Sequence, residues 1–178
     1  IVVVLTFVLN LHINNTLPTN NEIVSENDLF ISNNENTCMQ YNEIREMRIP
    51  ILMYHHISED PSKWNDTIIS PDKFREDMLY LKVLGYNAIH FKDYIDYIEK
   101  GKELPDNPIF ITFDDGYLSN YQYAYPVLKE LDMKATISVI GWSVGRKYHK
   151  DGVTPINEHF TWEQAREMYN SGIIDIQH

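Results

Sequence analysis

The chain has little cysteine, little positive charge and no apolar run long enough to cross a membrane. Only one of its 178 residues, Cys38, is a cysteine, so the sequence excludes an internal disulfide and a cluster of thiolate metal ligands. It has 15 Lys and Arg residues against 26 Asp and Glu residues, a net charge of −11. Such a chain repels polyanions, so nucleic acid and anionic membrane surfaces are poor candidates as partners.

The first 47 residues differ in composition from the rest of the chain. Residues 1–13 are apolar but too few to span a bilayer, and they predict the remnant of a signal peptide or membrane anchor. We therefore expect an exported protein, extracellular or held at the cell surface. The alternative is that residues 1–13 form a first buried strand. Residues 14–47 are rich in Asn, Ser, Thr and Glu and predict a flexible linker.

From residue 48 onward, short apolar runs alternate with patterns of helical period. The runs predict strands at residues 49–54, 86–91, 108–113, 135–140 and 173–177. Helices are predicted by Ser70-Pro71 with Gly85, by the stripe Tyr94, Ile95 and Ile98, by Tyr121, Tyr125, Leu128 and Leu131, and by Thr161 with Gln164. This order predicts a parallel α/β domain over residues 48–178.

Two adjacent carboxylates end the most apolar of these strands. Asp114 and Asp115 follow residues 108–113, and Gly116 permits a turn that lets the two side chains face one site. One carboxylate can then hold a metal while the other faces a bound water. The alternative is that Asp-Asp-Gly serves only as a turn after a strand.

Imidazoles follow other predicted strands. His55 and His56 follow residues 49–54, and His178 follows the last strand. Since parallel strands all end at one edge, these side chains and the two carboxylates are expected to converge there. A carboxylate and imidazoles beside a second acid suit a divalent cation such as zinc, with Asp114 taking a proton from water. We interpret His90, His149 and His159 as surface or structural residues.

Three segments in order resemble the polysaccharide deacetylases of the NodB homology family, carbohydrate esterase family four. They are Ile51-Leu52-Met53-Tyr54-His55, Thr112-Phe113-Asp114-Asp115-Gly116-Tyr117 and Lys134-Ala135-Thr136. The resemblance implies a distorted (β/α) barrel, here partial, that removes N-acetyl groups from GlcNAc-containing glycans such as poly-β-1,6-GlcNAc, peptidoglycan or chitin. It implies a divalent metal, zinc or else cobalt or nickel.

The resemblance also assigns roles to individual residues. Asp114 takes the place of the base and Asp115 that of a metal ligand. The other two ligands of the family come from a His-Ser/Thr-x-x-x-His segment, of which His178 is either the first histidine or the residue before it. We expect the sequence to be the front part of a longer protein. His55 is expected to line the pocket, and Tyr117 either contacts substrate or packs after the turn.

Two other functions stay open on the sequence alone. A glycan-binding module that keeps the pocket but lacks catalysis is one alternative. An esterase that removes O-acetyl groups from xylan-type polymers is the other. The sequence does not indicate an oligomeric state.

Overall fold

The computed structural model describes residues 4–6 and 48–178. Within the apolar N-terminal segment, β1 (Val4–Thr6) pairs antiparallel with β2 (Pro50–Tyr54), with Val4 opposite Leu52. The rest of residues 1–13 and the predicted linker at 14–47 lie outside the described residues, so the signal or anchor segment stays a prediction. Among the described residues, no helix has both the length and the apolar character needed to cross a bilayer.

A mainly parallel sheet forms the centre of the domain. Its strands follow the order β1-β2-β6-β7-β8, in which β6 is Pro108–Phe113, β7 is Ala135–Ser138 and β8 is Ile174–Gln177. Strands β2, β6, β7 and β8 are all parallel. The short β5 (Asn87–Ala88) pairs with the start of β6, also in parallel. The predicted parallel α/β fold is confirmed.

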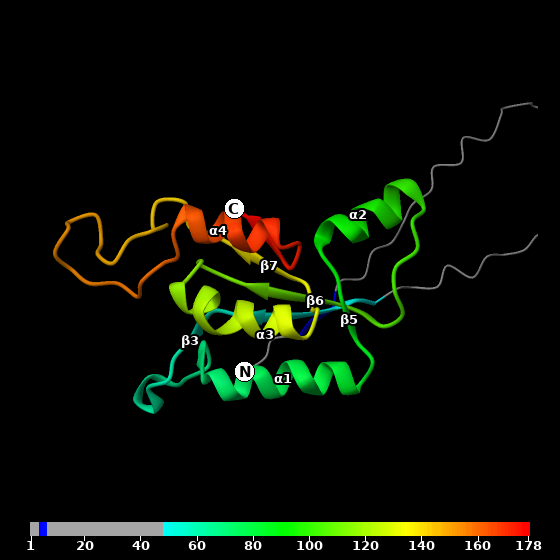
Figure 1. The fold of residues 1–178 in the computed structure, drawn as a ribbon, viewed down its shortest axis with the longest axis horizontal. Helices are drawn as coiled ribbons and strands as arrows, with labels where there is room; N and C mark the ends of the chain where they lie inside the picture. The colour runs from blue at the N-terminus through cyan, green and yellow to red at the C-terminus, as the bar shows by residue number, and fades with distance from the viewer. Residues whose placement is uncertain (1–3, 7–47) are drawn as a thin grey trace, which may run out of the picture. The chain divides into compact units, whose positions relative to one another are not determined.

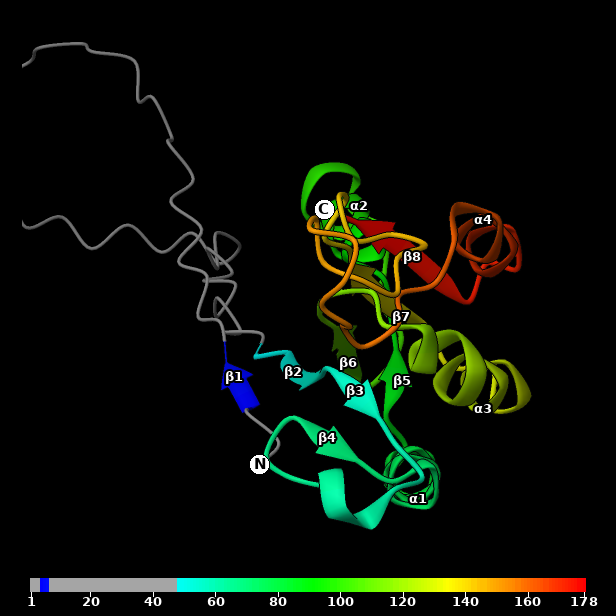
Figure 2. The ribbon, with the colours of Figure 1, turned by 90° about the vertical axis from the view of Figure 1, so that its left-hand side faces the viewer.

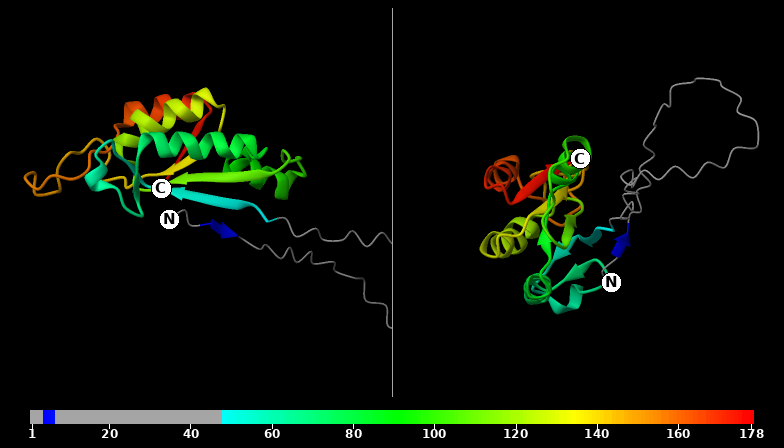
Figure 3. Two further views of the ribbon diagram at one scale, coloured as in Figure 1. Left: turned by 90° about the horizontal axis from the view of Figure 1, so that it is seen from below. Right: turned by 90° about the vertical axis from the view of Figure 1, so that its right-hand side faces the viewer.

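Helices cover the sheet. Helices α1 (Pro71–Val83), α3 (Tyr125–Glu130) and α4 (Trp162–Asn170) lie on one side of the strands, as Figure 1 and the left view of Figure 3 show. α1 and α4 begin where the sequence predicts. The Ser70 side chain accepts a hydrogen bond from the Lys73 amide, and Thr161 and Gln164 form a capping box.

Strand β6 is buried on both of its faces. Ile109, Ile111 and Phe113 enter the main core, whereas Phe110 points to the other face and packs in a smaller cluster with Ile49. A continuous run of apolar residues fits a strand that has no solvent face. The carboxylates that follow β6 are therefore attached to the most enclosed strand of the sheet.

Local structure departs from the sequence prediction at three places. The predicted strand at residues 86–91 is only Asn87–Ala88, because Phe91 already begins α2. The predicted third helix opens with a π-helical turn, Asn120–Ala124, before α3. A second, two-stranded sheet of β3 (His56–Ile57) and β4 (Ile68–Ile69), joined through the short 3₁₀ helix Pro61–Lys63, was not predicted, since two-residue strands show no periodicity.

Helix α2 (Phe91–Lys100) is not buried along the whole apolar stripe that predicted it. In its first turns Phe91 stacks on Phe110 of β6, and Tyr94 packs edge-on against the same ring. Ile95 and Ile98 are 49% and 38% exposed, so this part of the apolar stripe lies at the surface. The helix contacts the sheet through its amino-terminal end.

The buried acid of α2 is neutralised by two lysines. Asp96 accepts hydrogen bonds from Lys100 and Lys102, each at 2.6 Å. These bonds, that from Lys100 first, lower the pKa of Asp96 from its ordinary value of 3.8 to about 2. A carboxylate with a depressed pKa stabilises the folded state above its unfolded pKa, and this stabilisation is lost as pH falls through the folded pKa.

Replacing this acid should give a pH-dependent loss of stability. Asp96→Asn is expected to lower the urea midpoint at neutral pH. The difference from the unmodified protein should shrink as the pH falls from 3.8 to about 2, where Asp96 itself becomes protonated. Urea titrations followed by circular dichroism at several pH values measure this. A difference that stays constant over that interval would mean that the ion pairs do not cause it.

Candidate active site

Four strands end at one edge of the sheet, and this edge carries the polar groups. In Figure 2 the carboxyl ends of the strands face the viewer. His55 follows β2, Asp114 follows β6, Val139 follows β7 and His178 follows β8. Enzymes with parallel α/β folds keep their active sites at this edge.

The chain turns sharply directly after Asp114. Asp115 has φ of 72° and Gly116 has φ of 77°, so two successive residues adopt the left-handed conformation. The Gly116 amide donates to the Asp114 carbonyl at 3.0 Å, which closes the turn. The backbone thus leaves the extended conformation that would place the two carboxylates on opposite faces.

Asp114 lies beside the imidazole that ends the neighbouring strand. Its Oδ2 is 3.6 Å from Nε2 of His55. The two side chains are 37% and 25% exposed, so both are reachable from solvent while held by the sheet. The Asp114 amide donates to the Tyr54 carbonyl at 3.0 Å, which continues the ladder between β6 and β2 up to the carboxylate itself.

One peptide bond after β7 contacts both Asp115 and His178. The Val139 carbonyl lies 3.1 Å from Nδ1 of His178, and the Ile140 amide lies 3.5 Å from the Asp115 carbonyl. If Nδ1 carries the proton, this contact leaves Nε2 of His178 with a free lone pair, the arrangement common in metal-binding histidines. The role of His178 as a ligand stays a prediction.

The described residues fit a divalent metal in donor chemistry but supply only part of a site. Carboxylate oxygen from Asp115 and imidazole nitrogen from His178 are donors that zinc accepts. In residues 48–178, however, no three His, Cys, Asp or Glu side chains gather closely enough to hold an ion. A complete zinc site needs at least three protein ligands, so these two residues would need a further donor.

Tyr117 packs against two imidazole rings. Its ring centroid lies 4.9 Å from that of His56 and 5.0 Å from that of His159. His159 is only 8% exposed, and the sequence analysis assigned it no part in the site. Its neighbour Tyr117 lies far from it along the chain, and no motif links the two, so periodicity could not have predicted the contact.

The environment of these rings shifts their pKa values. Burial lowers the pKa of His56, with Lys63 and His159 acting in the same direction. Burial also lowers the pKa of His159, against the opposing effect of Asp115. Burial first, and then the nearby Asp115 carboxylate, raise the pKa of Tyr117 to about 12. Near neutral pH both imidazoles are therefore mainly uncharged and the phenol keeps its proton.

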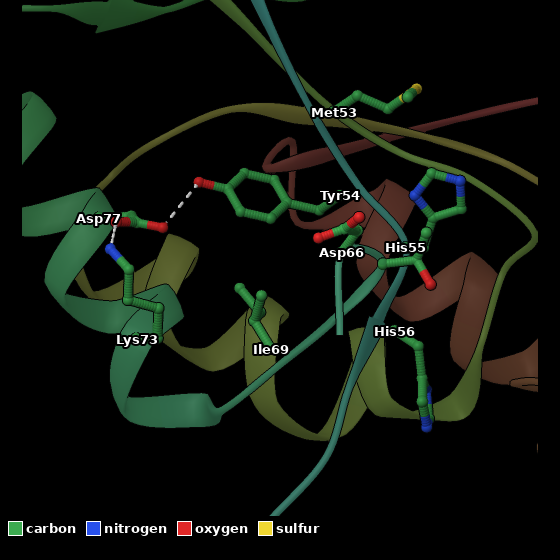
Figure 4. Close-up of a pocket in the computed structure, with 9 residues that line it drawn as sticks. Met53, Tyr54, His55, His56, Asp66, Ile69, Lys73 and Asp77 are labelled. Carbon is green, nitrogen blue, oxygen red and sulfur yellow. Dashed lines mark hydrogen bonds and ion pairs between the residues drawn. The ribbon is translucent and has the colours of Figure 1, made fainter. Parts of the chain in front are cut away.

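A small pocket lies behind His55, under β2. Figure 4 shows that Tyr54 and His55 leave the strand in different directions, Tyr54 toward Asp77 of α1. The Tyr54 hydroxyl donates to Asp77 at 3.3 Å, and Lys73 pairs with the same carboxylate. The pocket holds about 100 Å³, too little for a sugar ring with its substituents. The contact between Tyr54 and Asp77 joins the end of β2 to α1.

A wider groove opens beside Tyr117. Its volume is about 530 Å³, and it is lined by both polar and apolar groups, among them His56, Ser119, Tyr123, Asn157 and Glu158. The segment at 156–158 forms part of its wall, and the Leu118 amide donates to the Glu158 carbonyl at 2.7 Å.

Carboxylates and imidazoles at the carboxyl edge of a parallel sheet are an arrangement typical of α/β enzymes. Residues 101–178 match the polysaccharide deacetylase family, which the sequence motifs predicted. The chain is 40% identical over 126 residues to YxkH of Bacillus subtilis (strain 168), whose name places it among the polysaccharide deacetylases. That match covers 71% of this chain and 40% of the relative.

Two further proteins support the family and the fold. A poly-β-1,6-N-acetyl-D-glucosamine N-deacetylase of Escherichia coli (strain K12) is 25% identical over 130 residues, which cover 70% of this chain and 19% of that protein. The solved structure of a de-N-acetylase from Aggregatibacter actinomycetemcomitans superposes with a TM-score of 0.61 at 29% identity. The superposition covers 71% of this chain and 52% of the chain in the solved structure. The chain thus spans about half or less of the proteins it resembles.

Proposed function

We propose that the protein containing this chain is a metal-dependent hydrolase that removes N-acetyl groups from GlcNAc-containing polysaccharide. One observation carries the proposal: Asp114 and Asp115 lie on a left-handed turn at the sheet edge where His55 and His178 also end their strands. The names of the relatives support the substrate class, since the Escherichia coli protein is named for poly-β-1,6-N-acetyl-D-glucosamine.

Asp114 is suited to the role of general base. It is partly exposed, so that water reaches its carboxylate, and Nε2 of His55 lies 3.6 Å from one carboxylate oxygen. Asp114 would accept a proton from the water that attacks the acetyl carbon. The C–N bond of the amide then breaks, acetate leaves, and the sugar nitrogen takes up a proton to become an amine.

Asp115 and His178 would hold the divalent metal, together with at least one further donor. When bound, such an ion lowers the pKa of water and polarises the acetyl carbonyl. The protein's own contribution would be the turn after Asp114, which lets both carboxylates serve one site, so that one acid binds the ion while the other stays free to accept a proton.

Acetate release tests the proposal. The protein should release acetate from GlcNAc oligomers, and dialysis against a chelator should lower the rate by at least about 10²-fold, because the metal supplies most of the activation of water. Added zinc should restore the rate. An enzymatic acetate assay with oligomers and with acetylated xylan measures both.

Each other outcome points to a different function. Release from acetylated xylan alone would identify an O-acetyl esterase. Binding of the oligomers without acetate release, with zinc present, would identify a glycan-binding module. An unchanged rate after removal of metal would contradict the metal-dependent mechanism while leaving deacetylation in place.

A further inference from the structure

The pairing of β6 with β7 places a serine beside Asp114 that no sequence motif indicated. The two strands are parallel, with Phe113 opposite Ile137. One residue further on, Asp114 comes opposite Ser138, the last residue of β7. Neighbouring strands lie about 4.8 Å apart, so one strand spacing separates the backbone of Ser138 from that of the proposed base.

The side chains of Asp114 and Ser138 lie on the same face of the sheet. The residue before each site position on three neighbouring strands is buried in the main core on the helix side: Tyr54, Phe113 and Ile137. Because successive side chains leave a strand on opposite faces, His55, Asp114 and Ser138 lie on the other face. The 3.6 Å contact of His55 with Asp114 agrees with this placement. Figure 4 shows His55 leaving β2 away from Tyr54.

This face changes from apolar to polar along the strands. Near the start of β6, Phe110 packs in the small apolar cluster with Ile49. Thr112 comes next on the same face, and its hydroxyl donates to the Leu52 carbonyl at 3.3 Å. The row at the carboxyl edge follows, in which Asp114 lies between His55 on one side and Ser138 on the other. Ser138 therefore belongs to the most polar part of this face.

The hydroxyl of Ser138 is available to a ligand. Ser138 is half-buried, and within residues 48–178 its hydroxyl forms no hydrogen bond. Its neighbour on β8 is Gln177, whose side chain is engaged, since it donates to Asp175 at 2.8 Å. Nε2 of His55 faces Asp114. In this row of the described sheet, the serine thus keeps an oxygen that can accept a hydrogen bond.

An acetamido group needs such an acceptor. In the proposed reaction the metal polarises its carbonyl oxygen, and the water deprotonated by Asp114 attacks its carbonyl carbon. The N–H is the polar group that these two interactions leave without a partner. An N–H that loses its water on binding and finds no acceptor weakens binding, so a site for amides gains from an acceptor beside the base.

We infer that Ser138 is a specificity-determining residue: its hydroxyl oxygen accepts a hydrogen bond from the N–H of the substrate's acetamido group. An acetyl ester has an oxygen in place of this N–H and cannot make the bond, so the contact favours N-acetyl over O-acetyl substrates. The inference rests on the proposed function, because it takes Asp114 as the place of deacetylation.

The test is Ser138→Ala, which removes only the hydroxyl. With zinc present, kcat/KM for GlcNAc oligomers should fall by about 3- to 10-fold, the range for one neutral hydrogen bond. The ratio of this constant to kcat/KM for the activated ester 4-nitrophenyl acetate should fall by the same factor. Ser138→Thr keeps a hydroxyl and should retain the ratio. Acetate and nitrophenolate release measure the two reactions.

A matched control is Ser171→Ala at the other end of the sheet. The Ser171 hydroxyl donates to the Met168 carbonyl at 2.6 Å, where α4 ends and before β8 begins. This variant also loses one serine hydroxyl and should keep the ratio of amide to ester hydrolysis. Thermal unfolding checks that each variant is folded.

The outcomes separate this inference from the proposed function. An equal loss on both substrates in Ser138→Ala would overturn the inference and assign the hydroxyl to the attacking water, which both reactions share. An unchanged rate on both would also overturn it, while deacetylation stays in place. If the unmodified protein with zinc releases no acetate from the oligomers, the proposed function itself fails, and the inference fails with it.

Discussion

Asp114→Asn should lower kcat for acetate release by a factor of about 10² to 10⁴, the usual contribution of a positioned general base. The amide has the shape of the carboxylate but cannot accept the proton of the attacking water. Zinc affinity should change little, because Asp115 and not Asp114 is the proposed ligand. Acetate assays and chelator competition on the same preparation measure both quantities.

A control for this variant lies at the opposite end of the same strand. Asp106 is exposed and precedes β6, whereas Asp114 follows it. Asp106→Asn removes one negative charge from the other end of β6 and should leave kcat unchanged. Retention of more than a tenth of the activity in Asp114→Asn would contradict its role as the base.

The sequence predicted the parts of the fold that have a local cause. Ser70-Pro71 and the Thr161–Gln164 pair start helices because a side-chain oxygen caps free backbone amides, and the structure contains both caps. The run at 108–113 is apolar throughout because β6 is covered on both faces. Because the predicted strands are parallel, Asp114 and His55, which follow two of them, are expected at the same edge of the sheet.

The surroundings of the site could not be predicted in the same way. The contact of His159 with Tyr117 depends on where the segment after β7 returns to the sheet, and nothing in its local sequence specifies that path. The docking of α2 through Phe91, with Ile95 left exposed, likewise depends on tertiary packing. Local patterns specify elements and their ends, whereas contacts between distant loops are specified only by the packed domain.

Substitution of Gly116, the glycine next to the two carboxylates, is expected to lower both stability and activity. Gly116 has φ of +77°, and an added Cβ would lie 3.1 Å from Cγ1 of Val139 and 3.4 Å from Cζ of Phe160. Gly116→Ala therefore meets two costs: about 1–2 kcal/mol for a left-handed backbone and about 1–3 kcal/mol for overpacking. Its free energy of unfolding should fall by the sum of both, and acetate release should fall sharply because the adjacent carboxylates shift.

Gly172→Ala separates these two costs. Gly172 has nearly the same backbone angle, φ of +75°, but an added Cβ meets no atom within 4 Å. This variant should lose only the conformational part, about 1–2 kcal/mol, and should release acetate at the normal rate. Urea titrations of the two variants give the difference, which equals the cost of contact with Val139 and Phe160. If both variants lost equal stability and kept equal activity, close packing around Gly116 would not be what holds Asp114 and Asp115 in place.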